Sequence, residues 1–115
     1  MSDSSDIGRA LDALYATLLD RKSADPTKSY AASLYSKGLD HILKKLGEEA
    51  TETLIAAKNG TRPELVYETV DLLYHLFVLM AQAGISPADL AVELDRRSGR
   101  SGLAEKASRT DGKDK

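Results

Sequence analysis

Apolar residues recur every three to four positions along most of the chain, which is the spacing of an amphipathic helix. The first such stretch covers about residues 6–22 and places its apolar side chains on one stripe. That stripe consists of Ile7, Leu11, Leu14 and Leu18, widened by Tyr15 and Leu19. Alternating apolar and polar positions, the pattern of a half-buried strand, do not occur. The pattern therefore predicts an all-α fold of about five helices arranged as an antiparallel bundle.

Two helices are expected after the loop around Pro26. Ser29 is a suitable N-cap for a short helix over residues 30–37. The next helix covers about residues 39–58, with an apolar side formed by Ile42, Leu46, Leu54 and Ile55. Gly47 lies in the middle of this helix, where glycine costs about 1 kcal/mol relative to alanine. Such a glycine indicates close approach of a neighbouring helix, which is the commoner cause, or of a ligand.

Capping signals mark the last two helices. Thr61 and Glu64 form a capping box at the start of a helix that runs to about residue 83. Ser86 begins a second capped helix, which continues to about residue 97. Each start is defined by a side chain that satisfies a free backbone N–H group, so these boundaries follow from local chemistry alone.

The second half of the fourth helix, residues 72–81, is apolar on nearly all sides. A helix of this kind is buried on more than one face. A chain of 115 residues has little other material to cover it. We therefore expect a homodimer whose interface includes this helix. His75 lies within the apolar stretch and is expected to be a hydrogen-bonded core residue rather than a metal ligand.

Length and charge limit the class of protein. A chain of this length forms one domain; we expect residues 1–98 to be that domain and residues 99–115 to be a basic, flexible tail. The net charge of -2 argues against nucleic acid as a partner. The absence of cysteine excludes disulfides and thiolate chemistry. The N-terminus lacks a signal peptide, and the longest apolar run is too short to cross a bilayer. The sequence predicts a cytoplasmic protein without a membrane partner.

Four acidic residues are placed symmetrically about the turn at Gly60. Glu52 precedes that glycine by the same number of residues as Glu68 follows it, and Glu49 is matched in the same way by Asp71. In an antiparallel helix pair, equal offsets give equal heights, about 12 and 16 Å from the turn at 1.5 Å per residue. Each pair has i, i+3 spacing and so shares one helix face. The two helices can therefore direct four carboxylates at one point.

Converging like charges need a compensating charge, and carboxylate ligands suit hard divalent cations such as Mg²⁺ or Mn²⁺. The simpler interpretation is that these residues are solvated surface carboxylates, as most Glu and Asp residues are. A cation held beside Lys and Arg side chains would suit phosphoryl chemistry, because the metal bridges phosphate oxygens and activates water.

Two charged neighbours extend this candidate site. Glu48 is rotated by about 100° from Glu49 on the helix; it is a candidate for holding a second ion or for acting as a base towards water. Lys45 is a candidate for neutralising the acids or contacting a phosphate, although it could also form an ordinary i, i+3 ion pair with Glu48. The basic residues near the C-terminus form either a solvated terminus or an arm that closes over phosphate groups.

The acidic motif Glu48-Glu49-x-x-Glu52 followed by Glu68-x-x-Asp71 resembles the signature of the all-α, MazG-like nucleotide pyrophosphohydrolases. Several flanking segments narrow the resemblance, because they are similar to the phosphoribosyl-ATP pyrophosphatase family. These segments are Ser29-Tyr30, Leu34-Tyr35-Ser36-Lys37-Gly38, Lys44-Lys45-Leu46-Gly47, Val70-Asp71-Leu72-Leu73-Tyr74-His75-Leu76 and Arg97-x-x-Arg100-Ser101-Gly102-Leu103. The resemblance covers about residues 7–109.

The resemblance implies a Mg²⁺-dependent dimeric enzyme that cleaves phosphoribosyl-ATP to phosphoribosyl-AMP and pyrophosphate, the second step of histidine biosynthesis. It implies metal ligation by Glu49, Glu52, Glu68 and Asp71, with Mn²⁺ as a substitute ion and with Glu48 and Glu49 as catalytic residues. Because no cyclohydrolase domain precedes residue 1, the stand-alone form of the enzyme is expected.

Residues beyond the acids must select the substrate, and the candidates are Lys37, Lys45, Arg97 and Arg100. Two alternatives remain open at this stage. One is a related enzyme that hydrolyses other nucleoside triphosphates. The other is a non-catalytic helical dimer whose acids bind a structural ion.

Overall fold

The computed structural model describes residues 4–98 and residue 106, and over these residues the chain is all-α, without strands. The described elements, in chain order, are α1 (Ser4–Asp20), the short 3₁₀ helix η1 (Arg21–Ser23), α2 (Tyr30–Lys37), α3 (Leu39–Asn59), α4 (Arg62–Ala83) and α5 (Pro87–Arg97). The predicted fold class and the five predicted helices are confirmed. Apart from residue 106, the expected tail at residues 99–115 lies outside the described residues.

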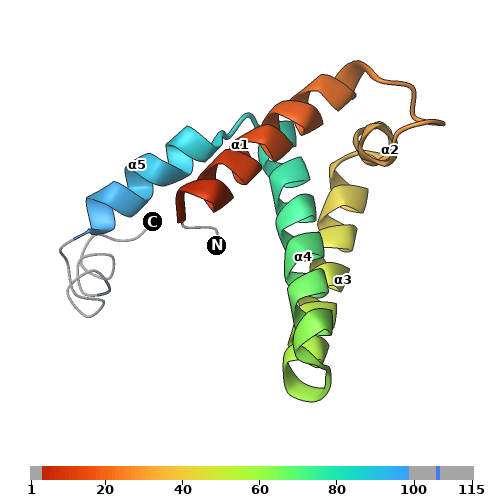
Figure 1. Cartoon of the computed structure of the whole chain (residues 1–115). Helices are drawn as coiled ribbons and strands as arrows, with labels where there is room; N and C mark the ends of the chain where they lie inside the picture. The colour runs from red at the N-terminus through yellow and green to blue at the C-terminus, as the bar shows by residue number, and fades with distance from the viewer. Residues whose placement is uncertain (1–3, 99–105, 107–115) are drawn as a thin grey trace.

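The helices α3 and α4 form a long antiparallel hairpin that projects away from the rest of the molecule (Figure 1). The end of the hairpin distant from the turn packs against α1 and α2, whereas α5 extends in another direction beside α1. The turn end has no other described element beside it (Figure 1). This arrangement gives the hairpin a packed half and an unpartnered half.

The predicted caps set the helix boundaries. Thr61 and Glu64 form the capping box at the start of α4, and Ser86 and Asp89 form a second one at the start of α5. The turn between α3 and α4 favours Gly60, because a Cβ atom there would lie 2.9 Å from the backbone carbonyl oxygen of Ala56. The hairpin that carries the acidic residues is therefore closed by local interactions.

The hydrophobic core lies where α1, α2, α3 and α4 meet. Its fully buried large side chains are Leu18, Leu34, Ile42 and Val78. Half of the other buried residues in the described part of the chain come from the second half of α4, namely His75, Phe77, Met80 and Ala81. Tyr15 packs edge-on against Phe77 and so joins α1 to this part of α4. The expected burial of α4 on more than one side is confirmed.

Some residues expected in the apolar interior remain exposed. Leu54 and Ile55, on the predicted apolar side of α3, are 71% and 56% exposed, and on α1 both Ile7 and Leu19 are exposed as well. At the level of Leu54 and Ile55 the hairpin lies beyond the reach of the other described elements, so none of them covers these two side chains (Figure 1). Of the two causes considered for Gly47, close approach of a helix is not seen within the described part of the chain, since a Cβ atom there would meet no heavy atom within 4 Å.

No single described helix is long and apolar enough to cross a membrane. The helices α4 and α5 meet that test of length and composition only when they are taken together, and they are bent by 103° at the break between them.

Candidate metal centre

Three carboxylates from the two arms of the hairpin meet at one point. One carboxylate oxygen from each of Glu49, Glu68 and Asp71 lies within 4.8 Å of the others. Glu49 comes from α3, whereas Glu68 and Asp71 come from successive turns of one face of α4. The convergence predicted from equal spacing about Gly60 is present for these three residues. Their role as ligands stays a prediction.

Glu52 lies beside this group but is not one of the three converging residues. A hydrogen bond between Glu52 and Glu68 is among the factors that raise the pKa of Glu68. The Glu52 side chain is exposed, and it follows Glu49 by one helical turn. Glu52 therefore lies on the solvent side of the three converging carboxylates.

The environment of the group raises the pKa of two of its carboxyl groups, those of Glu49 and Glu68. Glu49 is only 7% exposed, and burial is the main cause that raises its pKa, followed by the charges of Glu52 and Asp71. The pKa of Glu68 is also raised, first by desolvation and then by the charges of Glu52, Glu49 and Asp71. Both shifts have the direction expected when carboxylates are desolvated beside like charges.

Two oxygen atoms of this group lack a partner. Within the described part of the chain, Oε1 of Glu49 and Oε1 of Glu68 are buried and accept no hydrogen bond. Buried polar atoms are normally hydrogen-bonded, so unpaired ones need a physical explanation. A hard divalent cation would supply the missing interaction for carboxylate oxygens and offset their mutual repulsion. The residues present fit such an ion.

Lys45 and Glu48 form the ion pair that their spacing allows. Nζ of Lys45 lies 3.3 Å from Oε1 of Glu48, and Glu48 is more exposed than Glu49. The hydrogen bond with Glu48 is the largest cause that raises the pKa of Lys45, and Tyr30 adds to it. Glu48 is thus beside the acidic group but outside it, and its catalytic role stays a prediction.

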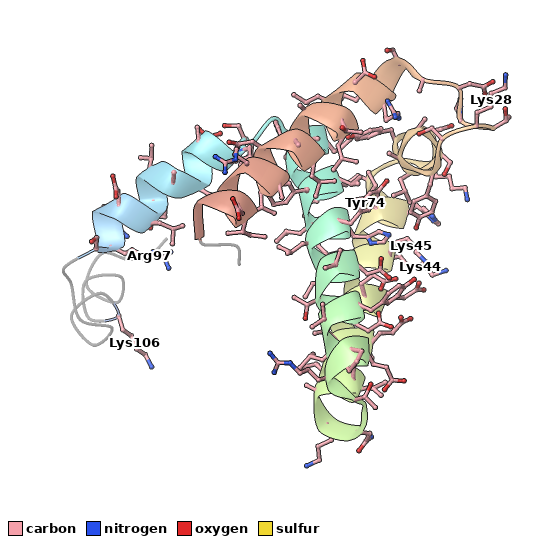
Figure 2. The ribbon with its side chains drawn as sticks, in the orientation of Figure 1. Lys28, Lys44, Lys45, Tyr74, Arg97 and Lys106 are labelled. Atoms are coloured by element: carbon pink, nitrogen blue, oxygen red, sulfur yellow. The ribbon has the colours of Figure 1, made fainter. Side chains whose placement is uncertain are left out.

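Basic side chains gather at the start of α3. The pKa of His41 is lowered by desolvation and then by the positive charges of Lys37, Lys44 and Lys45. Figure 2 shows Lys44 and Lys45 in the half of the hairpin nearer α2. The structure therefore places two of the proposed substrate-binding residues, Lys37 and Lys45, in one basic cluster. Lys44, which was not among the predicted site residues, belongs to the same cluster, and its position directly before Lys45 is the sequence signal for it.

Arg97 does not join this cluster within one chain. It lies at the far end of α5, away from Lys44 and Lys45 (Figure 2). Its Nε donates to Oε2 of Glu93 at 2.9 Å. Hydrogen bonds from Arg96 and Arg97 lower the pKa of Glu93 to about 2. Arg100, the other arginine proposed for substrate binding, lies outside the described residues.

The rings of Tyr30, Tyr74 and His75 form an aromatic cluster next to the acidic residues. The hydroxyl of Tyr30 lies 2.9 Å from Nε2 of His75, and Nδ1 of His75 lies 2.8 Å from the carbonyl oxygen of Asp71. Tyr30 also stacks on Tyr74, with ring centroids 6.1 Å apart. His75 is buried with both nitrogens satisfied, as expected for a core histidine. The link to Tyr30 was missed because it joins residues far apart in the sequence, for which spacing gives no signal.

An open pocket adjoins the acidic group on the turn side. Glu52 and Glu68 line it together with Ile55, Ala56 and Glu64, and its volume is about 330 Å³. Its acidic and apolar lining does not suit phosphate groups unless a cation is present. The basic cluster at the start of α3 lies on the other side of the acids, so phosphates find complementary charge in that direction.

The fold and the site define an all-α protein with an acidic centre, built between two antiparallel helices, that suits a divalent cation. Residues 11–98 match the profile of the phosphoribosyl-ATP pyrophosphohydrolase family. The chain belongs to this family.

Individual relatives agree with the family match. The chain is 59% identical over 101 residues to a phosphoribosyl-ATP pyrophosphatase of Geobacter sulfurreducens, covering 88% of this chain and 94% of that protein. It is 61% identical over 99 residues to the protein of the same name from Methylococcus capsulatus, covering 86% of this chain and 94% of that protein. The resemblance carried by the acidic motif and its flanking segments is confirmed.

Proposed function

We propose that this chain hydrolyses phosphoribosyl-ATP to phosphoribosyl-AMP and pyrophosphate, the second step of histidine biosynthesis. The observation that carries the proposal is the meeting of Glu49, Glu68 and Asp71 within a chain of this family. In the reaction, the oxygen of water forms a bond to phosphorus and the anhydride bond between the α and β phosphates breaks. Pyrophosphate leaves, and the protons of the water pass to bases or to solvent.

Glu49, Glu52, Glu68 and Asp71 are proposed to hold Mg²⁺, for which Mn²⁺ may be substituted experimentally. Such an ion offsets charge on the phosphates and on the departing pyrophosphate and lowers the pKa of bound water. The two buried oxygens without partners, one on Glu49 and one on Glu68, support this assignment. Glu52, at the exposed side of the group, is proposed as the most accessible ligand.

Glu48 and Glu49 are proposed as catalytic residues with different tasks. Glu49 is buried and faces the other acids, which suits a residue that fixes the metal position. Glu48 is half-exposed, and its carboxylate is held by Lys45. An accessible, oriented carboxylate can accept a proton from the attacking water. We therefore assign Glu48 as the base.

Lys37 and Lys45 are proposed to bind phosphate groups, joined by Lys44. This assignment is supported by the joint effect of the three lysine charges, which lower the pKa of His41 at the start of α3. Arg97 is proposed to act on the site of a second chain, because it is remote from the acids of its own chain (Figure 2). Arg100 is proposed to act with Arg97. Arginine is suited to this task because its planar group binds phosphate through two parallel hydrogen bonds.

A homodimer is proposed because the turn half of the hairpin exposes large apolar side chains. These are Leu54, Ile55, Val66, Tyr67 and Val70, all more than half exposed. Contiguous apolar surface on a folded chain marks an interaction site. The exposed residues lie on the same two helices that carry the acids, so the second copy is proposed to dock on the hairpin.

The dimer is tested by size-exclusion chromatography with light scattering, which measures the mass of the eluting protein. We expect a mass of twice the 12.4 kDa chain and its reduction by Val66→Lys. Val92→Lys is the matched control, because Val92 is also an exposed valine but lies on α5. A monomeric wild type, or dissociation by the Val92 variant instead of the Val66 variant, would refute association through the hairpin.

Pyrophosphate release tests the activity. With Mg²⁺ present, phosphoribosyl-ATP should be cleaved in strong preference to a panel of ribo- and deoxyribonucleoside triphosphates. Glu49→Gln and Asp71→Asn should lower turnover by more than about 100-fold, since even outer-shell partners of a metal site contribute about 10–100-fold. The control is Asp12→Asn, which alters an exposed acid on α1. Preference for a plain triphosphate would refute the substrate assignment, and retained turnover in the Glu49 variant would refute the metal site.

A further inference from the structure

The hydroxyl of Thr53 lies between the two helices that carry the acids. Its Oγ1 is 2.9 Å from the carbonyl oxygen of Glu49, one turn back on α3. The same atom is 3.1 Å from the carbonyl oxygen of Glu68, on α4. Both carbonyls belong to residues whose side chains meet at the candidate metal centre. Thr53 is half-buried and lines no part of the site itself.

The contact with Glu49 alone would need no explanation. Serine and threonine in helices commonly donate to the carbonyl four residues back. Thr51 does so too, with Oγ1 at 3.1 Å from the carbonyl oxygen of Gly47, but Thr51 is exposed and contacts no other helix through this group. The contact from Thr53 to Glu68 is different, because it crosses from α3 to α4.

This crossing occurs where like charges meet between the two helices. Glu49, Glu68 and Asp71 face one another at this level, and their like charges oppose close approach of α3 and α4. On α3, the residues beside Thr53 along the helix interface include the small, buried Ala56. A hydroxyl has a single hydrogen, so the two carbonyl oxygens share one donor. Sharing requires both backbones to stay within hydrogen-bond distance of Oγ1.

We propose that Thr53 is a positioning residue that sets the separation of Glu49 and Glu68 by linking their backbones through one hydroxyl. This inference rests on the proposed function, since the distance matters only if the two acids share an ion. A cation requires its ligands at fixed spacing, and partners that orient the ligands change metal affinity by about 10–100-fold. Loss of the hydroxyl therefore lowers affinity for the cation without removing any ligand.

The test is the affinity of the intact protein for Mn²⁺ and Mg²⁺, measured by calorimetry without nucleotide. Thr53→Val keeps the shape of the side chain and removes the donor, so we expect binding about 10-fold weaker than wild type. Thr53→Ser keeps the donor and should bind within about twofold of wild type. Thr51→Val removes the same local bond without a cross-helix link and should leave affinity unchanged.

Each outcome decides the proposal. Equal weakening by the valine and serine variants, or by Thr51→Val, would show that packing or helix stability is responsible and would overturn it. A lower thermal midpoint for Thr53→Val with unchanged metal affinity would overturn it as well. Thr53→Ala, which removes the donor without adding bulk, gives the same test if the valine variant does not fold.

Kinetics separate this inference from the proposed function. With phosphoribosyl-ATP, the Thr53→Val enzyme should need about 10-fold more Mg²⁺ for half-maximal rate, whereas kcat at saturating Mg²⁺ stays near the wild-type value. If the wild type cleaves no nucleotide, the proposed function fails while the calorimetric comparison still decides the role of Thr53. If the wild type is active and the Mg²⁺ requirement is unchanged, only the role of Thr53 fails.

Discussion

The Tyr30 hydroxyl lies 2.9 Å from Nε2 of His75, and this contact ties α2 to the helix that carries Glu68 and Asp71. The opposite nitrogen of the ring, Nδ1, must donate, because its partner is the carbonyl oxygen of Asp71. In the neutral ring Nε2 is then an acceptor, and the tyrosine hydroxyl donates to it. His75 thereby fixes the position of Tyr30 at the border of the acidic group.

Removing the Tyr30 hydroxyl should destabilise the fold. Tyr30→Phe leaves Nε2 of His75, a residue only 4% exposed, without a partner. An unsatisfied buried polar group costs about 1–3 kcal/mol. We expect a loss of this size in the free energy of unfolding, measured by urea denaturation. Tyr67→Phe is the control, since Tyr67 is exposed; equal stability of the two variants would contradict the inferred role of the hydroxyl.

In the metal-free protein, Glu49 and Glu68 should contribute stability that rises as the pH falls from about 7.5 towards 5, whereas His41, whose pKa is lowered, acts in the opposite direction. The pKa of Glu49 is raised in the folded state, mainly by burial. An acid whose folded pKa exceeds its unfolded value contributes stability that is fully present below the unfolded pKa and is lost as the pH rises through the folded pKa. Glu68 acts in the same direction.

Thermal midpoints in a chelator measure this effect. The rise towards pH 5 should be smaller in Glu49→Gln, because the amide does not titrate. At pH 7.5 the same variant should be at least as stable as wild type, since one of several repelling carboxylates is gone. A steeper rise in the variant than in the wild type would be inconsistent with a raised pKa at Glu49.

Lys45→Met should weaken substrate binding more than it slows the chemical step. A hydrogen bond from a charged group contributes about 1.5–3 kcal/mol, so KM should increase about 10-fold or more. The value of kcat should fall by a smaller factor, because Lys45 also holds the carboxylate of Glu48. Lys28→Met is the matched control, because Lys28 lies in the loop before α2, away from Lys44 and Lys45 (Figure 2). Equal KM values for the two variants would exclude Lys45 from phosphate binding.

Gly47→Ala should stabilise the protein and reduce its activity. Alanine in a helix is favoured over glycine by about 0.5–1 kcal/mol, and open space surrounds this position within the chain. The methyl group would occupy space next to Glu48 and Glu49, where a ligand can approach. Gly8→Ala, at an equally open position in α1, should give a similar gain in stability with unchanged turnover. Full activity in both variants would leave Gly47 without a role in ligand access.

The helices and much of the acidic group could be predicted because their causes are local. Ser29, Thr61 and Ser86 begin helices by satisfying backbone groups within three residues of themselves. Equal spacing of Glu49 and Asp71 about Gly60 places them at equal heights in an antiparallel hairpin. Periodicity and caps depend only on neighbours along the chain, so the sequence by itself determined these features.

Other features depend on how the helices pack. The links from Thr53 to Glu68 and from Tyr30 to His75 join different helices. The rotation and separation of those helices are set by packing, to which spacing along one helix is blind. The same apolar pattern predicted burial for both Ile42 and Leu54, yet Ile42 is buried and Leu54 is exposed. Only the tertiary structure decided which half of the hairpin is covered, because burial depends on which other elements reach it.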